Sequence, residues 1–95
     1  MRKYETIFIL DCEIEEEAQK AIIERVKAEI EGAKGVIGKL DEWGKKKLAY
    51  PINFKTDGYY VFIEFEAEAE LPLALERIYR ITEGILKGLI VRKDD

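Results

Sequence analysis

The apolar residues of this chain recur at changing intervals, and the order of these intervals constrains the fold more than any other feature. Residues 4–10 (YETIFIL) are β-branched and aromatic, which is typical of a strand. Between about Glu15 and Glu31 the apolar residues instead step by four or three positions, which predicts a helix that ends near Gly32 and Gly35. The apolar stripe of this helix is expected to consist of Ala18, Ile22, Val26, Ile30 and Ala33.

The second half of the chain repeats this change of period. A strand is expected from about Val36 to Tyr50, bent near Gly44, because glycine inside a strand often marks a bulge. The turn NFKTDG (53–58) leads into a third strand, YYVFIEFEAE (59–68). A second helix starts near Pro72, and a fourth strand, ILKGLIVR (85–92), precedes a short KDD tail. The inward face of the second helix is predicted to carry Leu71, Leu75, Ile78 and Tyr79, and Gly84 to close it.

The resulting order is β-α-β-β-α-β, the split βαβ or ferredoxin-like pattern of the α+β class. Crossover handedness places both helices on one face of a four-stranded antiparallel sheet, with the first and third strands in the middle. We expect residues 1–95 to form a single domain, because one core usually occupies roughly 100 to 150 residues.

One face of such a sheet is left open to water. The apolar side of the third strand, from Tyr59 to Ala67, should lie under the helices. The opposite side of the two central strands then carries Ile7, Ile9, Tyr60 and Phe62. Contiguous apolar groups of this kind usually mark an interface, so we predict that they contact a protein partner. The alternative is that long Glu and Lys side chains fold over them.

Composition argues against catalysis and membrane insertion. The chain has no histidine, which removes the commonest general base and metal ligand near neutral pH. Its single cysteine, Cys12, lies beside two acids, excludes an internal disulfide and suits a reducing cytoplasm. No run approaches the ~20 apolar residues of a membrane helix. We therefore expect no enzyme activity, cofactor, metal, small-molecule substrate or membrane, although the hydrophobic fraction of 47% suffices for a core.

The segment EWGKKKLAYPINFKTDGYY (42–60) concentrates positive charge in a chain whose net charge is −4. Phosphate attraction combined with stacking surfaces is a common way to hold RNA. Lysine on an edge strand is also a device against edge-to-edge pairing, and this alternative remains open. The candidate RNA-binding residues of this segment and of the N-terminus are Lys45, Lys46, Lys47, Lys55, Trp43, Tyr50, Arg2, Lys3 and Tyr4.

An RRM-like module that binds single-stranded RNA shares this element order. Its third-strand signature is K/R-G-F/Y-G/A-F-V-x-F/Y. Here DGYYVFIEF (57–65) has an aspartate in the leading basic position and lacks the small residue between the aromatics. A second alternative is a ferredoxin-like regulatory module that self-associates through its open sheet and ignores RNA.

Four segments, MRKYETIFIL, EWGKKKLAYPI, DGYYVFIEFEA and GLIVRKD, together resemble the bacterial small-subunit ribosomal protein S6 family over essentially the whole chain. The resemblance implies a structural protein of the cytoplasmic ribosome. It would bind the central domain of small-subunit ribosomal RNA together with the small basic ribosomal protein S18. The family pattern also places Lys87 at a basic position, whereas Gly88 replaces a larger residue. Arg2, Arg92 and the lysines would contact the phosphate backbone of the RNA without reading its sequence. Tyr4, Trp43 and Tyr50 either stack on bases or pack locally.

Overall fold

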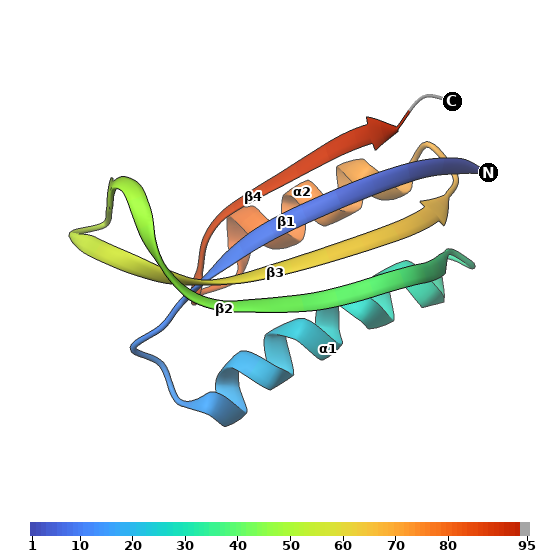
Figure 1. Ribbon diagram of the computed structural model, residues 1–95. Coiled ribbons are helices and arrows are strands. Elements are labelled where there is room, and N and C mark those ends of the chain that lie inside the picture. The colour runs from blue at the N-terminus through green and yellow to red at the C-terminus, as the bar shows by residue number, and fades with distance from the viewer. Residues whose placement is uncertain (94–95) are drawn as a thin grey trace.

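The computed structural model describes residues 1–93, and its elements follow the predicted order (Figure 1). The four strands pair antiparallel in the order β2-β3-β1-β4, so the predicted fold and the central position of the first and third strands are confirmed. Both helices lie on the same face of the sheet (Figure 1). The elements are β1 (Arg2–Asp11), α1 (Glu16–Gly32), β2 (Val36–Ile52), β3 (Lys55–Ala67), α2 (Leu71–Ile81) and β4 (Ile85–Lys93).

The core lies between the sheet and the two helices. Phe8, Val61 and Ile63 from the central strands are fully buried, and so are Val26 of α1 and Leu75 of α2. The four inward residues predicted for α2 are all buried. Alternation along β3 therefore places its purely apolar side under the helices, as predicted.

The apolar stripe of α1 differs from the predicted one. Ala18 and Ala33 are exposed, and Gln19 and Ile23 are buried instead. Ala33 lies beyond the last helical residue, where it caps the helix. Gln19 faces the sheet because its side-chain amide donates a hydrogen bond of 3.2 Å to the backbone oxygen of Asp11 at the end of β1.

The β2–β3 hairpin turns earlier than predicted. Its two-residue turn is Asn53–Phe54, both with positive φ, and β3 already begins at Lys55. Gly58, which was predicted to lie in the turn, is inside the strand. A Cβ at Gly58 would lie 2.3 Å from Cγ2 of Ile9, so this glycine serves close packing and not a turn.

The predicted bend at Gly44 is confirmed. Gly44 has φ +87, and the β2–β3 register shifts between Glu42 and Gly44. The register also shifts between Ile37 and Lys39 and again between Lys47 and Ile52, and the last shift leaves residues 48–51 outside the ladder. We call residues 45–58 the hairpin arm. It projects at the end of the molecule opposite to the two termini (Figure 1).

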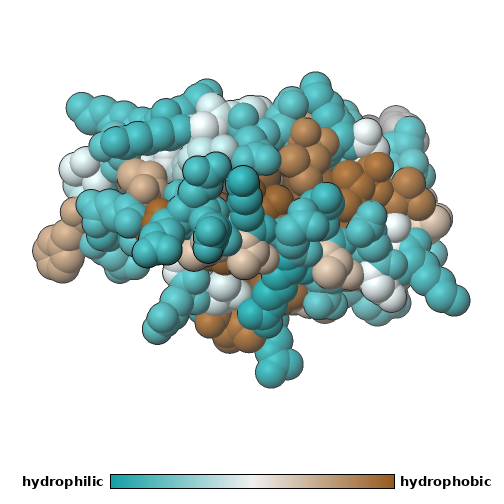
Figure 2. Space-filling model, turned by 90° about the horizontal axis from the view of Figure 1, so that it is seen from below, coloured by the Kyte–Doolittle hydropathy of each residue, from teal (hydrophilic) through white to brown (hydrophobic). Residues whose placement is uncertain are grey.

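The remaining surface is mostly hydrophilic. Seen from the side that carries α1 and the β2 edge, hydrophobic groups gather toward the end with the termini (Figure 2).

Gly84, with φ +97, lies in the turn after α2 and does not end the helix itself, which stops at Ile81. Of the predicted KDD tail, Lys93 belongs to β4, and residues 94–95 lie outside the described part of the chain.

Candidate nucleic-acid and protein interface

The predicted apolar patch is contiguous on the open face of the sheet. Ile7 pairs with Phe62 and Ile9 pairs with Tyr60 across β1 and β3. The patch continues onto β4, where Leu89 pairs with Ile7. Leu89 and Val91 are 54% and 58% exposed, and they were not among the residues predicted from the sequence. Their alternation with Ile90 was the signal that could have identified them.

The hairpin arm covers one end of this patch. Ile9 is only 8% exposed, because residues 48–52 bend back over it. A small cavity of about 70 Å³ remains between the arm and the sheet. It is lined by Ile9, Leu48, Ala49, Tyr50, Ile52, Tyr60 and Lys87. Ile9 and Tyr60 are thus largely engaged by the chain itself, and the accessible apolar surface lies around Ile7 and on β4.

Trp43 covers the neighbouring part of the patch. Its ring stacks on Phe62 with centroids 5.5 Å apart and planes inclined by 10°. Nζ of Lys46 lies 5.0 Å from the centroid of the Trp43 ring, within cation–π range. The cover over Phe62 is therefore an aromatic ring with a lysine above it, and not the glutamate and lysine stems considered from the sequence. Trp43 remains 43% exposed.

The three consecutive lysines lie on the edge strand β2, as predicted, and all are exposed. Their Cα partners on β3 are Tyr59 for Lys45, Gly58 for Lys46 and Asp57 for Lys47. Within the described residues, neither Lys45 nor Lys47 has a carboxylate oxygen within 4.0 Å. Their charges are therefore available to an anion from outside the chain.

Tyr50 and Lys87, which were predicted separately, come together. Nζ of Lys87 donates a hydrogen bond of 2.8 Å to the hydroxyl of Tyr50 and lies 5.3 Å from its ring centroid. This contact links the hairpin arm to β4 across the open face. Tyr50 is still 56% exposed, so one side of the ring is accessible.

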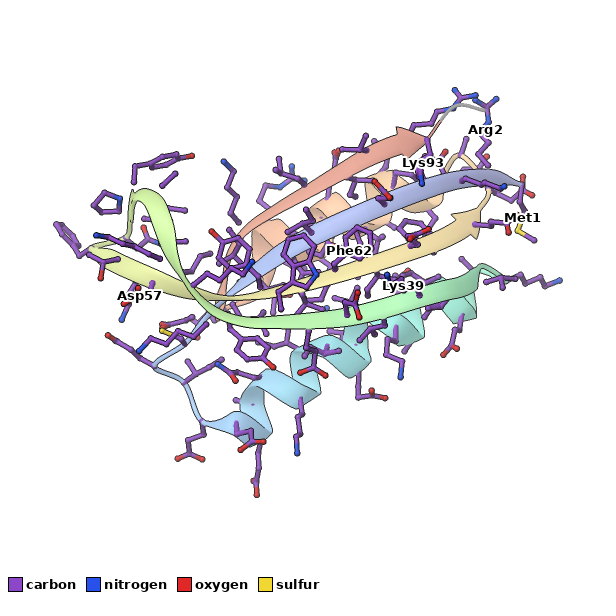
Figure 3. All side chains as sticks on the ribbon, viewed as in Figure 1. Met1, Arg2, Lys39, Asp57, Phe62 and Lys93 are labelled. Carbon is purple, nitrogen blue, oxygen red and sulfur yellow. The ribbon has the colours of Figure 1, made fainter. Side chains whose placement is uncertain are left out.

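The other predicted cations lie at the opposite end of the sheet. Lys3 pairs with Lys93, and Tyr4 pairs with Arg92. Figure 3 shows Arg2 and Lys93 at the end with the termini and Asp57 at the arm. Because Asp11 pairs with Gly58 eight positions along β1 from Lys3, the two basic groups are about 26 Å apart. The basic residues therefore form two clusters and not one.

Two predicted RNA contacts are corrected. Tyr4 is 6% exposed and its ring stacks on Phe65 in the core, so it packs locally and cannot stack on a base. Lys55 forms ion pairs with Glu13 and Asp11, the latter at 3.6 Å. Its hydrogen bond to Glu13 raises the pKa of the Lys55 ammonium. Lys55 thus fastens the arm to the β1–α1 connection and is already neutralised.

The arrangement does not favour an RRM-like surface. An RRM stacks bases on aromatic residues of its open sheet. Here Phe62 lies under Trp43, and Tyr60 lines the cavity beneath the arm. Within residues 1–93 there is no group of three or more acidic or cysteine side chains arranged to hold a metal ion. No helix in the described part is long and apolar enough to cross a membrane.

One further polar contact lies between β2 and β3. The hydroxyl of Tyr59 donates a hydrogen bond of 2.7 Å to Oε1 of Glu42. This bond, aided by burial, raises the pKa of Tyr59 to about 12. Cys12 is half-buried, as expected for a small loop residue, and lines a separate surface pocket together with Tyr59 and Glu42.

Known proteins resemble this chain over nearly its full length. The family described as Ribosomal protein S6 matches residues 3–92. The small ribosomal subunit protein bS6 of Clostridium novyi is 51% identical, over 99% of both chains. That of Caldanaerobacter subterraneus is 50% identical over the full length of both. The crystal structure of 30S ribosomal protein S6 from Thermotoga maritima superposes with a TM-score of 0.91 and 35% identity, covering 97% of this chain and 87% of that one. The chain therefore belongs to the ribosomal protein S6 family, a structural family of the small ribosomal subunit and not a family of enzymes.

Proposed function

We propose that this protein binds the central domain of small-subunit ribosomal RNA together with ribosomal protein S18. The RNA backbone would follow the basic clusters at the two ends of the sheet, and S18 would cover the open face between them. The observation that carries the proposal is the exposed apolar surface of Leu89 and Val91 on a sheet whose other face packs against the two helices.

The RNA side of the proposal rests on exposed cations next to aromatic rings. Lysine ammonium groups attract phosphates without reading sequence, and exposed aromatic faces can stack on bases. Three lysine–phosphate contacts would make the affinity fall roughly twenty- to fortyfold for a fourfold rise in salt. With Tyr4 and Lys55 removed, the proposed RNA contacts are Arg2, Lys3, Trp43, Lys45, Lys46, Lys47, Tyr50, Lys87 and Arg92.

The protein side rests on the apolar strip and the charges beside it. Ile7, Phe62 and Leu89 form one cross-strand row, and Val91 lies next to it on β4. Glu5 and Glu64 are opposite each other on β1 and β3 in the adjacent row, and Glu5 also forms an ion pair of 3.3 Å with Lys93. An apolar core with carboxylates at its rim suits a small basic partner. Such a partner would also offset the net charge of −4, which disfavours RNA.

The test is a titration of central-domain ribosomal RNA with the protein in the presence and absence of S18. The decisive variant replaces Lys45, Lys46 and Lys47 with Glu. The matched control makes the same charge change at three exposed cations elsewhere, Lys20, Arg25 and Lys34. We expect tight binding only with S18 and a loss of at least about tenfold for the arm variant. We also expect a salt dependence whose slope falls by about 2 to 3 for that variant.

Equal losses for the two variants would attribute the effect to net charge alone and would refute a specific phosphate contact at the arm. Equal binding with and without S18 would indicate an independent RNA-binding protein. An absence of RNA binding under both conditions would leave the lysines with the edge-protection role and would overturn the proposal.

A further inference from the structure

The tip of the hairpin arm presents an aromatic ring entirely to solvent. Phe54 is 102% exposed, the largest value among the exposed large hydrophobic side chains of residues 1–93. It therefore contributes nothing to the packing of its own chain. A ring of this size costs hydrophobic free energy in water, so a contact with a second molecule would have to compensate for it.

The backbone at this ring is also unusual. Phe54 has φ +64 and its neighbour Asn53 has φ +49, so both central positions of the turn are left-handed. Hairpin turns of this kind favour Asn-Gly, because glycine adopts positive φ without a Cβ clash. A bulky residue at positive φ is a true outlier, and such outliers cluster at binding sites. The short turn, which is closed by the pairing of Ile52 with Lys55, places the ring at the tip of the arm.

The surroundings of Phe54 favour a nucleic-acid base over an apolar protein pocket. Its neighbours Asn53, Lys55 and Thr56 are polar, whereas protein hot spots are usually surrounded by a ring of further contacts. Lys47 carries an exposed charge on the same arm. Its Cα partner on β3 is Asp57. Asp57 follows Phe54 by three residues, which corresponds to about 10 Å along the extended chain. A phosphate held at Lys47 would bring the adjoining nucleotides within reach of the tip.

We propose that Phe54 stacks on an unpaired RNA base at the tip of the hairpin arm. This inference rests on the proposed RNA-binding function and adds a residue to it that neither the charge pattern nor the family resemblance indicates. The ring provides a sequence-tolerant contact, because every base has a π-face. It fixes the position of the arm on the RNA, while the lysines supply the charge.

The experiment compares Phe54→Gly, Phe54→Leu and Phe54→Trp in the titration of central-domain ribosomal RNA with S18. Loss of a stacked base should weaken binding by about 5- to 150-fold. We expect such a loss for the Gly and Leu variants and near-normal affinity for Trp. The control is Leu73→Ala, which removes another strongly exposed apolar side chain from α2 and should have no effect. Chemical probing should reveal a base protected by the wild-type protein and reactive with the Gly variant.

The outcomes separate this inference from the function on which it rests. Phe54→Gly should not lower the thermal unfolding midpoint, because glycine adopts a positive φ without the steric strain of a side chain. Normal RNA affinity of the Gly variant, combined with a loss for the lysine-to-glutamate variant, would overturn the stacking role alone. Retained affinity of the Leu variant with loss in the Gly variant would replace the base by an apolar protein pocket. Failure of the wild-type protein to bind RNA would overturn both.

Discussion

The two faces of the sheet are built from the same strands but have different neighbours. On β3, Val61, Ile63 and Phe65 are at most 2% exposed, while the intervening Phe62 and Glu64 remain half-buried. The helices cover the central part of the first face, and only partly buried residues such as Leu40 and Ile90 lie at its edges. The second face is covered at one end by the hairpin arm and Trp43, and β4 remains exposed.

This difference assigns stability and binding to different residues. Large apolar groups on the covered face contact many neighbours of the same chain, and their loss leaves a cavity. Apolar groups such as Leu89 on the open face are largely exposed, and contiguous exposed groups of this kind usually mark an interface. Substitutions of equal size on the two faces should therefore affect different measurements.

The largest effect is expected for Ile63→Ala on the covered face. The side chain is fully buried, so the variant should lose about 2 to 5 kcal/mol of the free energy of unfolding. Leu89→Ala on the open face should lose about 1 kcal/mol or less, because the side chain is already 54% exposed. Urea denaturation measures both, and equal losses would contradict the division between the faces.

The next effect concerns Gly88 on β4. A Cβ at this position would lie 2.2 Å from Cδ2 of Tyr79, so β4 and α2 approach closely here. Gly88→Ala should destabilise the protein by about 1 to 3 kcal/mol through overpacking. Gly32→Ala, with no atom within 4 Å of the added group, is the matched control and should be neutral or slightly stabilising. Thermal unfolding compares the two, and a neutral Gly88→Ala would show that the Tyr79 ring moves aside at no cost.

A smaller effect is expected when one hydroxyl is removed from each face. On the covered side, the hydroxyl groups of Tyr79 and Thr6 are hydrogen-bonded at 2.7 Å, and Thr6 also donates to the backbone oxygen of Leu89 at 2.8 Å. Tyr79→Phe should cost about 1 kcal/mol. Tyr50→Phe loses only an exposed bond to Lys87 and should cost less than about 0.5 kcal/mol. The reverse order in chemical denaturation would mean that the arm contact dominates.

The smallest effect should appear in alkaline solution, because it depends on a hydrogen bond at the surface, where water screens the charge. The hydrogen bond to Glu42 raises the pKa of Tyr59 from 10.0 to about 12 in the folded state. The folded protein therefore holds this proton more tightly than the unfolded chain, and the resulting stability is present in full below pH 10. It is lost as the pH rises from about 10 to about 12. Tyr59→Phe should show a flatter decline over this range in unfolding experiments, and an unchanged decline would attribute it to other groups.

The fold was predictable because its signals are periodic and local. The alternation on β3 and the inward residues of α2 were correct, and the glycine bend at Gly44 was also confirmed. The hairpin turn was misplaced because Asp57–Gly58 resembles a turn, whereas Gly58 actually makes room for Ile9. Membership of the ribosomal protein S6 family confirms the predicted ribosomal role, the location on the cytoplasmic ribosome and the absence of enzymatic activity.

The candidate site was less predictable, because it depends on which residues meet in space. The sequence could not show that Tyr4 stacks on Phe65, that Lys55 is neutralised by Glu13, or that the arm bends over Ile9. It also could not show that the length of the strands separates the basic residues into two clusters at opposite ends of the sheet. These features arise from long-range packing, which a period or a charge run does not encode.

The most direct test of the division between the faces measures S18 binding by a Leu89→Thr, Val91→Thr double variant. Threonine keeps the strand propensity and removes the apolar surface, so the free energy of unfolding should change by about 1 kcal/mol or less. We predict at least tenfold weaker binding to S18 and unchanged binding for the Leu73→Ala control. Unaltered S18 affinity of a folded double variant would contradict the account, because the open face would then not be the surface that the partner covers.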